Sequence, residues 1–590
     1  MPILTSPAVA ITEKDYSQVV PFAATGEGAL AGDFARGPIN MPVLVSSVDD
    51  LELFFGRPTD TNYKAWFSAY NFLQYSSKLW VVRILPVGAL NAADTTALLI
   101  ENKNVFESKV DAADAGLTAA GLFIAKSAGV VGNSLRVIML DNDAYIAFSA
   151  DTTSYLDENG DHLKKYFRTE GPTTSAWMSD TIKNTTAMDE IHVIILDATG
   201  AITGVKNRVL EVHEGLSKVA DAKDYLDQNI YYVNYLNNNS EWIYSTYVSP
   251  VFTLPTGTLN WGILSADATT GVFKELDATV NETLSGGVAG SLVAANGVSA
   301  LQTGFNMFLD KDEINVSYLI TADYPVAVQK YVVDSIAEVR KDAIAFISSH
   351  DDSKPFTDRT TLVSDLRSFR DTTLNVNSSY AVLDSGYKYQ FDGFAQKYRW
   401  IPLAADVAGV CARLDSEHES WYSPGGFTRG RIKNVLKLSS NLNQPSRDQL
   451  YPKQINAVVS FPGKGTVLFG DRTLQAKPSA FQSIHIRRLF IILEKAIADA
   501  AQYQLFELNN ASTRNRFIGM VEPFLRSVQS RDGLADFKVV CDSSNNTDDT
   551  VARGEFVADI YIKPLYSIQY VILNFVATKS SIQFNQVVGK

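Results

Sequence analysis

The stretches INVSYLIT (314–321), YPVAVQKYVVDSIAEV (324–339) and AIAFISS (343–349) decide the fold class. The first and the last are short apolar runs rich in β-branched and aromatic residues, which is typical of buried strands. The stretch between them has apolar residues at helical spacing. A strand, a helix and a strand in this order predict a β-α-β unit with a parallel, right-handed crossover. LQTGFNMFL (301–309) predicts a further helix just before the unit.

Residues 21–90, on the N-terminal side, have the same mixed character and are expected to form the first part of a core. VDDLELFFG (48–56) predicts a short helix that ends at the glycine. NYKAWFSAYNFLQYSSK (62–78) predicts an amphipathic helix, and LWVVRIL (79–85) predicts a buried strand.

Residues 91–350 differ in composition from both flanks, because short β-rich runs alternate with segments of Thr, Asn, Asp and Gly. The predicted strands are SLRVIML (134–140), EIHVIILD (190–197) and RVLEVHEG (208–215). This pattern indicates an inserted, surface-displayed, β-rich region that ends in the α/β unit described above.

Residues 351–578 form the second predicted part of the core. The expected helices are 399–415, a long one over 487–507, and 513–530; the expected strands are DFKVVCD (536–542), EFVADIYIKP (555–564) and SIQYVILNFVA (567–577). The predicted fold class is therefore α/β (α+β) and multidomain, with a core of mixed sheet and helices built from both ends of the chain.

Two terminal arms complete the organisation, residues 1–20 and 579–590. Val9 and Ile11 in the first, and Ile582 and Phe584 in the second, alternate with other residues at the period of a β-strand. Such isolated strands can add to the sheet edge of a neighbouring copy. The alternative, that both arms fold back onto their own subunit, stays open.

Composition and charge exclude several classes of function. The net charge of −13 over 590 residues argues against a general nucleic-acid binder, which usually carries a basic surface. Two cysteines, Cys411 and Cys541, exclude a disulfide framework. The apolar stretches are too short to span a membrane, and the N-terminus lacks the pattern of a secretory signal.

Short motifs of known chemistry are incomplete in this chain. FPGKGTVLFGDRT (461–473) contains Lys464 after a glycine, but Val458 stands where a phosphate-binding loop needs its first glycine, so a structural β-turn is expected. The stretch that begins at Asp157 resembles a calcium loop, but His162 and Arg168 replace the required Gly and Glu, and we expect a hairpin turn. The six histidines form no zinc-binding pair.

Longer strings carry a specific likeness to a known family. They are LFFGRPTDTNYKAWFSAYNFLQYSSKLWVVRIL (53–85), RWIPLAADVAGVCARLD (399–415), WYSPGGFTRGRI (421–432), VLFGDRTL (467–474), HIRRLFIILEKAI (485–497), YQLFELNNASTRNRF (503–517), VVCDSSNNT (539–547) and EFVADIYIKPLYSIQYVILNFVAT (555–578). In these segments the chain resembles the contractile tail sheath proteins of myoviruses, those of T4-like bacteriophages in particular. The likeness covers about residues 20–90 and 375–580.

The resemblance implies a structural subunit that polymerises as stacked six-fold rings around a tail tube and contracts to drive the tube through a host envelope. It implies copies of the chain itself, the tail tube, the baseplate and the tail terminator as partners, and no cofactor, nucleic acid or stable membrane insertion. The location would be the virion tail, after synthesis and assembly in the host cytoplasm. The span from 91 to 135 is too short for the full outermost domain of T4-like relatives.

Arg487 and Arg488 are the candidate contacts to the tube. They stand at the start of the long predicted helix, where the helix dipole disfavours cations. The resemblance places this helix in the inward-facing core, so we expect at least one of the two to meet acidic groups on the tube. An intramolecular pair with a core carboxylate is the alternative.

Two other functions remain open at this point. The first is the sheath of a phage-derived bacteriocin or secretion device. The second, of a different class, is a phosphate-handling α/β enzyme that uses Lys464.

Overall fold

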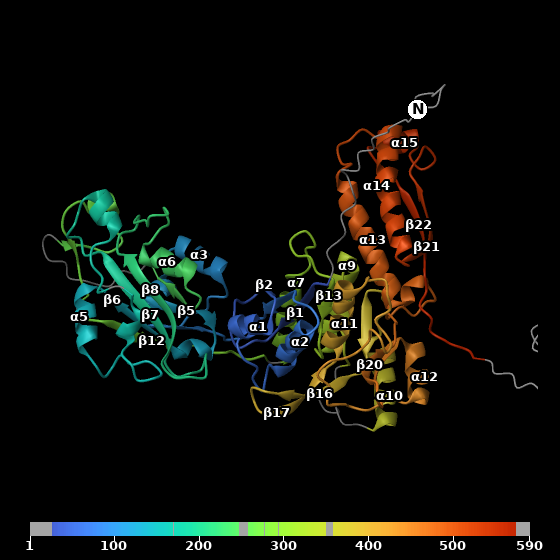
Figure 1. Cartoon of the computed structure of the whole chain (residues 1–590), viewed down its shortest axis with the longest axis horizontal. Coiled ribbons are helices and arrows are strands. Elements are labelled where there is room, and N and C mark those ends of the chain that lie inside the picture. Colours follow the sequence, from blue (N-terminus) through green and yellow to red (C-terminus); the bar gives the residue numbers. More distant parts are fainter. Residues whose placement is uncertain are drawn as a thin grey trace, which may run out of the picture. The chain divides into compact units, whose positions relative to one another are not determined.

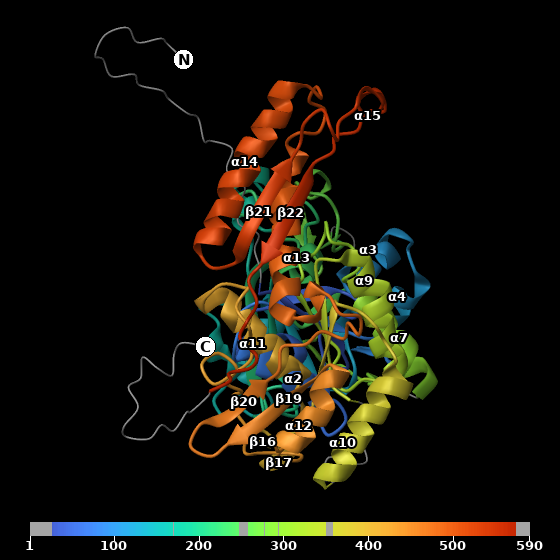
Figure 2. The ribbon, with the colours of Figure 1, turned by 90° about the vertical axis from the view of Figure 1, so that its right-hand side faces the viewer.

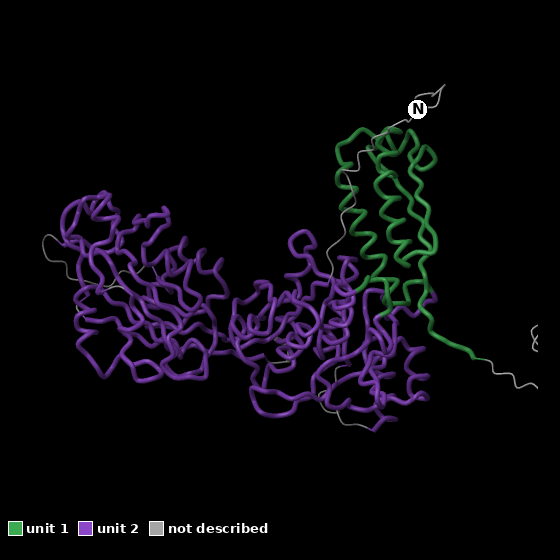
Figure 3. The backbone as a smooth tube through the Cα atoms, in the orientation of Figure 1, with its two compact units in different colours: residues 1–24, 418–423, 479–590 green, residues 25–417, 424–478 purple. Residues whose placement is uncertain are grey.

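The computed structural model describes residues 26–168, 170–246, 258–276, 278–292, 294–349 and 358–573. The described chain divides into two compact units, shown in Figure 3. The smaller unit holds residues 418–423 and 479–573, and the larger unit holds most of the rest. Both contain helices and sheets, which confirms the predicted α+β class.

An eight-stranded, mostly parallel sheet forms the centre of the larger unit (Figure 1). Its strands, in spatial order, are β2 (Pro42–Val45), β3 (Leu79–Arg83), β1 (Gly28–Gly32), β13 (Tyr318–Ile320), β14 (Ile344–Ile347), β15 (Ala381–Asp384), β19 (Ile455–Phe461) and β20 (Gly465–Phe469). The two outermost strands, β2 and β20, pair antiparallel with their neighbours. The six inner strands are parallel and largely buried, as expected when helices cover both faces.

The β-α-β unit predicted at 314–349 is confirmed. β13 and β14 pair in parallel, and α8 (Val326–Tyr331) continues through a π-helical turn, Val332–Ala337, into α9 (Glu338–Arg340) between them. Both strands belong to the main sheet, although the predicted boundary at residue 350 assigned them to the inserted region.

Helices from both ends of the chain pack on this sheet. α1 (Val48–Phe55) begins at Ser47, whose hydroxyl accepts a hydrogen bond from the backbone N–H of Asp50, and it ends at Gly56 with a positive φ of 76°. The other helices are α2 (Tyr63–Leu73), α7 (Ala294–Asn306), α10 (Arg359–Ser368), α11 (Ala404–Glu417) and α12 (Gln444–Leu450). α2 and α11 contact each other, so residues more than 330 positions apart in the chain share one core.

The inserted region has its own sheet and its own hydrophobic core. Its sheet has the order β12 (Val280–Thr283), β6 (Leu135–Leu140), β7 (Glu190–Asp197) and β8 (Arg208–Ser217), all antiparallel. Around it lie α3 (Lys103–Asp111), α4 (Ala115–Ala120), α5 (Asn142–Ala150), α6 (Tyr232–Asn239), and the strands β4 (Asn91–Ala93), β5 (Phe123–Ala128), β9 (Ile243–Ser245), β10 (Thr258–Leu259) and β11 (Val272–Phe273).

The chain enters and leaves the inserted region through two segments that lie side by side. Antiparallel bridges join Val87 to Ser291 and Leu90 to Val288. The region is therefore attached to the main sheet by a narrow two-stranded connection.

A small antiparallel sheet lies beside the main one, formed by β16 (Tyr387–Asp392), β17 (Lys397–Pro402) and β18 (Lys437–Leu438). The first residues of the helix predicted over 399–415 belong to β17 instead, and α11 starts only at Ala404. Pro402 ends the strand and cannot continue as helix interior, which separates the two elements.

The smaller unit consists of α13 (Ile484–Gln502), α14 (Ala511–Ser530), α15 (Asp548–Ala552) and the hairpin of β21 (Leu534–Val540) and β22 (Asp559–Pro564). Figure 2 shows α14 lying beside the two strands. The predicted apolar face of α13 is confirmed, because Leu489, Leu493, Ala496 and Ala500 are buried in the core of this unit. α13 ends at Gln502, five residues before the predicted end at 507.

The strand predicted at 567–577 is wrong for the described part of that stretch. Residues 565–573 follow β22 without regular secondary structure. Their β-branched and aromatic residues favour a strand, but a strand also needs a partner, and in the described chain β21 and β22 pair only with each other.

Candidate functional site

Arg487 and Arg488 are buried side chains of α13. They are 4% and 3% exposed. The guanidinium of Arg487 forms an ion pair with Glu494 at 3.1 Å and lies 4.5 Å from the centre of the Phe481 ring. Arg487 therefore has an intramolecular carboxylate partner, but the Glu494 side chain is 53% exposed and is not the core carboxylate of the alternative. Burial of both side chains gives no support to a direct tube contact in this conformation.

The four arm residues, Val9, Ile11, Ile582 and Phe584, lie outside the described residues. Strand donation by the two arms stays a prediction.

Residues 565–573 form a further candidate interaction segment, in addition to the two terminal arms. The structure describes this segment, and its large apolar side chains are exposed. Ile568 is 84% exposed and Ile572 is 83% exposed, and Tyr570, Val571 and Leu573 are exposed as well. Scattered exposed apolar residues are common, but a continuous run of this kind marks an interaction surface. In the sequence this segment contains the uninterrupted apolar run YVIL (570–573), which lies within the predicted strand 567–577.

The hairpin of β21 and β22 offers open strand edges in the same unit. The burial of β22 alternates, so Ile560 and Ile562 pack on the helices while Tyr561 faces outward and is 60% exposed. Among the described residues no third strand joins this sheet. A two-stranded sheet of this kind can accept further strands.

The incomplete motifs have structural roles. Lys464 lies in the tight turn between β19 and β20, where its backbone N–H donates to the carbonyl of Phe461 and its ammonium lies 4.3 Å from the centre of the Phe427 ring. Asp157 accepts hydrogen bonds from the backbone N–H groups of Asn159 and Asp161 and so forms the predicted hairpin turn.

Within the described chain, no three His, Cys, Asp or Glu side chains converge as a metal site would need. The helices described are also too short or too polar to cross a membrane.

A buried polar network connects the small antiparallel sheet to α11, and sequence motifs gave no sign of it. The ammonium of Lys388 on β16 lies 2.9 Å from the carboxylate of Asp406 on α11, and both side chains are buried. The hydroxyl of Tyr75 donates to the same carboxylate at 3.0 Å. Burial raises the pKa of Asp406 and lowers the pKa of Lys388, so their attraction offsets the cost of desolvating both charges.

Asp384, at the end of β15, is the second buried carboxyl group of this region. Ser348 donates its hydroxyl to Oδ2 at 2.6 Å, and the backbone N–H of Gly386 donates to Oδ1 at 2.7 Å. Burial raises the pKa of Asp384 to about 7, against the lowering effect of these two hydrogen bonds. Ser348 also accepts from the N–H of Ala404 at 2.9 Å, so the group connects β14, β15 and the start of α11.

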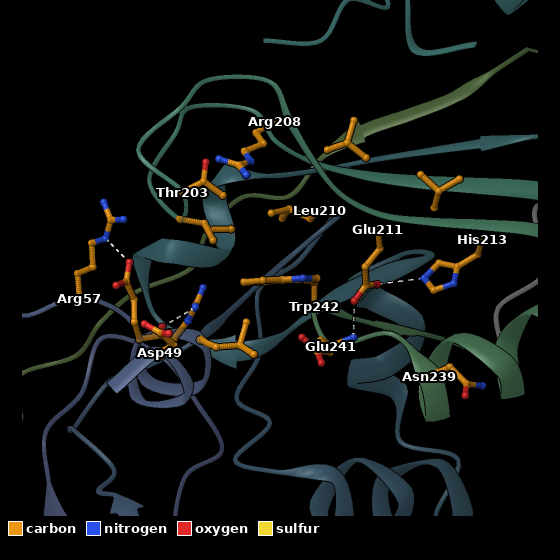
Figure 4. Close-up of a pocket in the computed structure, with 16 residues that line it drawn as sticks. Asp49, Arg57, Thr203, Arg208, Leu210, Glu211, His213, Asn239, Glu241 and Trp242 are labelled. Atoms are coloured by element: carbon orange, nitrogen blue, oxygen red, sulfur yellow. Dashed lines mark hydrogen bonds and ion pairs between the residues drawn. The ribbon is translucent and has the colours of Figure 1, made fainter. Parts of the chain in front are cut away.

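A cleft of about 780 Å³, here called the β8 cleft, opens where the inserted region meets the main sheet. Its walls are α1 and the residue Arg57 on one side, and β8 with the segment after α6 on the other (Figure 4). Figure 4 shows Arg57 and Asp49 facing Glu211 and His213 across the cleft, with Trp242 between them.

Most charged groups at the β8 cleft have partners within the chain. Glu52 pairs with Arg57, and Glu211 accepts hydrogen bonds from the His213 ring at 3.0 Å and from the N–H of Glu241 at 2.7 Å. Burial raises the pKa of Glu211, but these hydrogen bonds outweigh it and the net shift is downward. Glu211 is therefore an anion near neutral pH.

Arg36 lies deep in the β8 cleft and is 7% exposed. One nitrogen, Nη2, donates to the carbonyl of Glu52 at 2.7 Å, and the guanidinium lies 4.7 Å from the centre of the Trp242 ring. Nε is buried without a hydrogen-bond partner among the described residues. Burial lowers the pKa of Arg36 to about 10.

The phage tail sheath protein central domain matches residues 317–474, and the phage tail sheath C-terminal domain matches residues 476–578. The tail sheath protein of Vibrio phage KVP40 is 31% identical over 679 aligned positions, covering 99% of this chain and 100% of that protein. The tail sheath protein of Enterobacteria phage T4 is 29% identical and covers 99% of each chain.

Among solved structures, the sheath tail protein of Listeria innocua is similar in fold. The TM-score is 0.50 at 11% identity, with 93% of this chain and 94% of that chain covered.

The alignments to the KVP40 and T4 proteins are longer than the 590 residues of this chain. Both phage proteins therefore carry residues that this chain lacks.

Proposed function

This chain belongs to the phage tail sheath family and is a subunit of a contractile tail sheath; from that premise we propose that its copies stack as six-membered rings around a tail tube. The extended lattice stores free energy at assembly, and a signal from the baseplate releases it, so that rearranged subunit contacts drive the tube through the host envelope. The tail tube, baseplate and tail terminator are the proposed partners. The proposed place of assembly is the host cytoplasm.

The observation that carries the proposal is the exposed apolar run at 565–573 in the unit that also holds the open hairpin of β21 and β22. A subunit that joins a polymer by strand exchange needs both a donor segment and an acceptor edge. The arms 1–20 and 579–590 are further proposed donors. Each backbone hydrogen bond in such a joint contributes roughly 0.5 to 1.5 kcal/mol net, so a few are enough to keep neighbours connected while other contacts change.

Deletion of the arms tests this proposal. Proteins lacking residues 1–20 or 579–590 should be folded monomers with circular dichroism spectra close to that of the intact chain, because residues within 26–573 supply the hydrophobic cores described above. Negative-stain microscopy should show tubes for the intact chain and none for either deletion. Normal tubes that still contract in both deletions would exclude linkage through the arms.

The proposal also assigns no enzymatic activity or cofactor to the chain. Lys464 projects over an aromatic ring at a hairpin turn, which is a packing role. Lys464→Ala should assemble normally, and neither protein should hydrolyse ATP in a phosphate-release assay. Saturable nucleotide binding that is lost in the variant would favour the phosphate-handling alternative.

A further inference from the structure

Residues 424–478 differ in charge from the rest of the chain. They contain nine Lys or Arg residues and two acidic ones, Asp448 and the buried Asp471, whereas the whole chain has a net charge of −13. The inserted region, residues 91–290, has twice as many acidic as basic residues. In a polymer of identical copies, a cationic surface of one copy attracts an anionic surface of another.

A cluster of phenylalanine rings lies within this basic segment, beside the last two strands of the main sheet. The ring centres of Phe427, Phe461 and Phe469 are 5.0, 5.3 and 5.8 Å apart. Phe427 is 45% exposed and Phe469 is 38% exposed, so the cluster is open to solvent. Apolar side chains that gather on the surface in this way mark an interaction site.

Three cations surround the rings. The guanidinium of Arg447 on α12 lies 5.2 Å from the centre of the Phe469 ring. The ammonium of Lys464 packs on Phe427, as described above. Arg431 is exposed and pairs directly with Val467 of β20, so its side chain lies on the same face of the sheet as Phe469, two residues further along β20. The six residues of this surface, here called the phenylalanine patch, are Phe427, Arg431, Arg447, Phe461, Lys464 and Phe469.

The inserted region carries an exposed turn, residues 224–227, that is both apolar and acidic. Tyr225 is 93% exposed and Leu226 is 60% exposed. The carboxylates of Asp224 and Asp227 flank them. Lys223 pairs with Asp227 at 2.8 Å, but Asp224 leaves the turn with a net negative charge. The turn therefore matches the phenylalanine patch in apolar character and opposes it in charge.

Hydrogen bonds hold this turn in one shape. The carboxylate of Asp224 accepts from the backbone N–H of Leu226 at 2.8 Å and from that of Gln228 at 2.9 Å. An antiparallel bridge joins Lys223 to Asn229 at the base of the turn. A segment of fixed shape loses little conformational entropy when it binds.

We propose that the turn 224–227 of one copy docks on the phenylalanine patch of a second copy. Tyr225 and Leu226 contact the exposed rings, and the carboxylates of the turn lie near Arg431 and Arg447. Two different surfaces of one chain meet in this contact, which is the kind of interface that builds an open helical polymer. The inference rests on the proposed polymer of identical copies.

The contact adds to strand exchange and does not replace it. A turn of four residues buries far less surface than the roughly 1,200 Å² of a stable interface, so tubes should form without it. Single changes at Lys464 or Tyr225 should therefore weaken the contact and leave tube formation intact.

The binding test uses the full-length monomer and a fluorescein-labelled cyclic peptide of residues 223–229, Lys-Asp-Tyr-Leu-Asp-Gln-Asn. Fluorescence polarisation should show saturable binding. Replacing both Asp residues of the probe by Asn, or its Tyr and Leu by Ser, should each weaken binding by about tenfold or more, since each removes the charged or the apolar half of the contact. The labelled peptide of residues 309–313, Leu-Asp-Lys-Asp-Glu, is more acidic but has no aromatic ring, and it should bind at least about tenfold more weakly than the cyclic probe.

Two protein variants and one control locate the site. Arg431→Glu and Arg447→Glu each reverse one charge of the phenylalanine patch and should weaken the cyclic probe by about tenfold or more. Arg431 is exposed, so its variant keeps the fold even if the loss of the Arg447 side chain from the Phe469 ring disturbs it. Lys477→Glu makes the same change in net charge at an exposed residue outside the patch and should leave the affinity within about twofold. Circular dichroism checks the fold of each variant.

Each of the following binding results would overturn the proposal. Absence of saturable binding up to about 1 mM probe would exclude the docking. Equal binding of the Asn probe would exclude recognition of the carboxylates. Equal binding of the 309–313 peptide, or unchanged affinity of Arg431→Glu, would show a general attraction to acidic chains. Failure of the intact chain to form tubes would refute the proposed function, whereas binding of the probe to the monomer does not depend on tubes.

Discussion

At the scale of a single residue, the buried carboxyl group of Asp384 makes the free energy of unfolding depend on pH. Its pKa is raised to about 7 in the folded protein, so the folded state holds the proton more tightly than the unfolded state does. The stability from this group is complete below the unfolded pKa of about 4 and is lost as the pH rises towards 7, at about 1.4 kcal/mol per pH unit.

Asp384→Asn should remove that dependence, because the amide carries no charge at any pH. In urea unfolding series from pH 5 to pH 8, the free energy of unfolding of the parent should fall relative to that of the variant as the pH rises to 7. Asp111→Asn, an exposed position at the end of α3, is the control and should show no such trend. A difference between Asp384→Asn and the parent that is constant across the series contradicts the assignment.

The pair of Lys388 and Asp406 predicts a strongly asymmetric effect of substitution. Lys388→Met leaves the carboxylate of Asp406 buried without its cation and should cost about 3 to 5 kcal/mol. Adding Asp406→Leu removes the isolated charge and should recover much of that loss. Urea unfolding of the two variants at pH 7 makes the comparison, and a double variant less stable than Lys388→Met alone would show that the carboxylate is held by other partners.

At the scale of an element, the start of α14 depends on one side chain. Asn510 accepts a hydrogen bond from the backbone N–H of Thr513 at 3.0 Å. Asn510→Ala should lower the free energy of unfolding by about 1 kcal/mol, whereas Asn510→Ser keeps a capping oxygen and should cost much less. Thermal unfolding followed by circular dichroism compares them, and equal losses for Ala and Ser would exclude capping as the cause.

Elements with a clear local pattern were predictable from sequence. EIHVIILD (190–197) is β7 over the same residues, and Gly56 ends α1 as expected. α2 was predicted with one apolar face, yet Phe67 and Ser68 are buried too, because α2 lies between the sheet, α11 and β17. Burial on several sides is a tertiary property, and a helical period cannot reveal it.

The sites were less predictable than the elements. Arg487 pairs with Glu494, which lies roughly two turns further along the same helix. The sequence spacing alone did not distinguish this pair from a contact with another protein. Arg36, Glu211 and Trp242 meet at the β8 cleft only through tertiary folding, since they come from three distant segments. The network of Lys388, Asp406 and Tyr75 escaped prediction for the same reason.

At the scale of the whole molecule, residues 565–573 should be required for assembly and dispensable for folding. Ile568→Asp plus Ile572→Asp places charges on side chains that are exposed in the monomer, so the monomer should lose at most about 0.5 kcal/mol. In a polymer the same charges would be buried without partners, and negative-stain microscopy should show no tubes. Tyr225→Asp, at a residue 93% exposed in the inserted region, is the control and should form tubes. Tubes from the double variant would show that this segment stays in solvent.

The narrow connection of the inserted region also has a consequence for synthesis on the ribosome. β1 needs β13 as a neighbour, and β13 emerges about 290 residues later, or roughly 15 to 60 s at typical translation rates. During that delay one edge of β1 is open. Once the inserted region has folded, the bridges of Val87 with Ser291 and of Leu90 with Val288 hold its two ends together. The loop that separates β3 from β13 then shrinks to a few tens of flexible residues, so its closure costs less entropy. The nascent chain should therefore complete the inserted region first and close the main sheet around it afterwards.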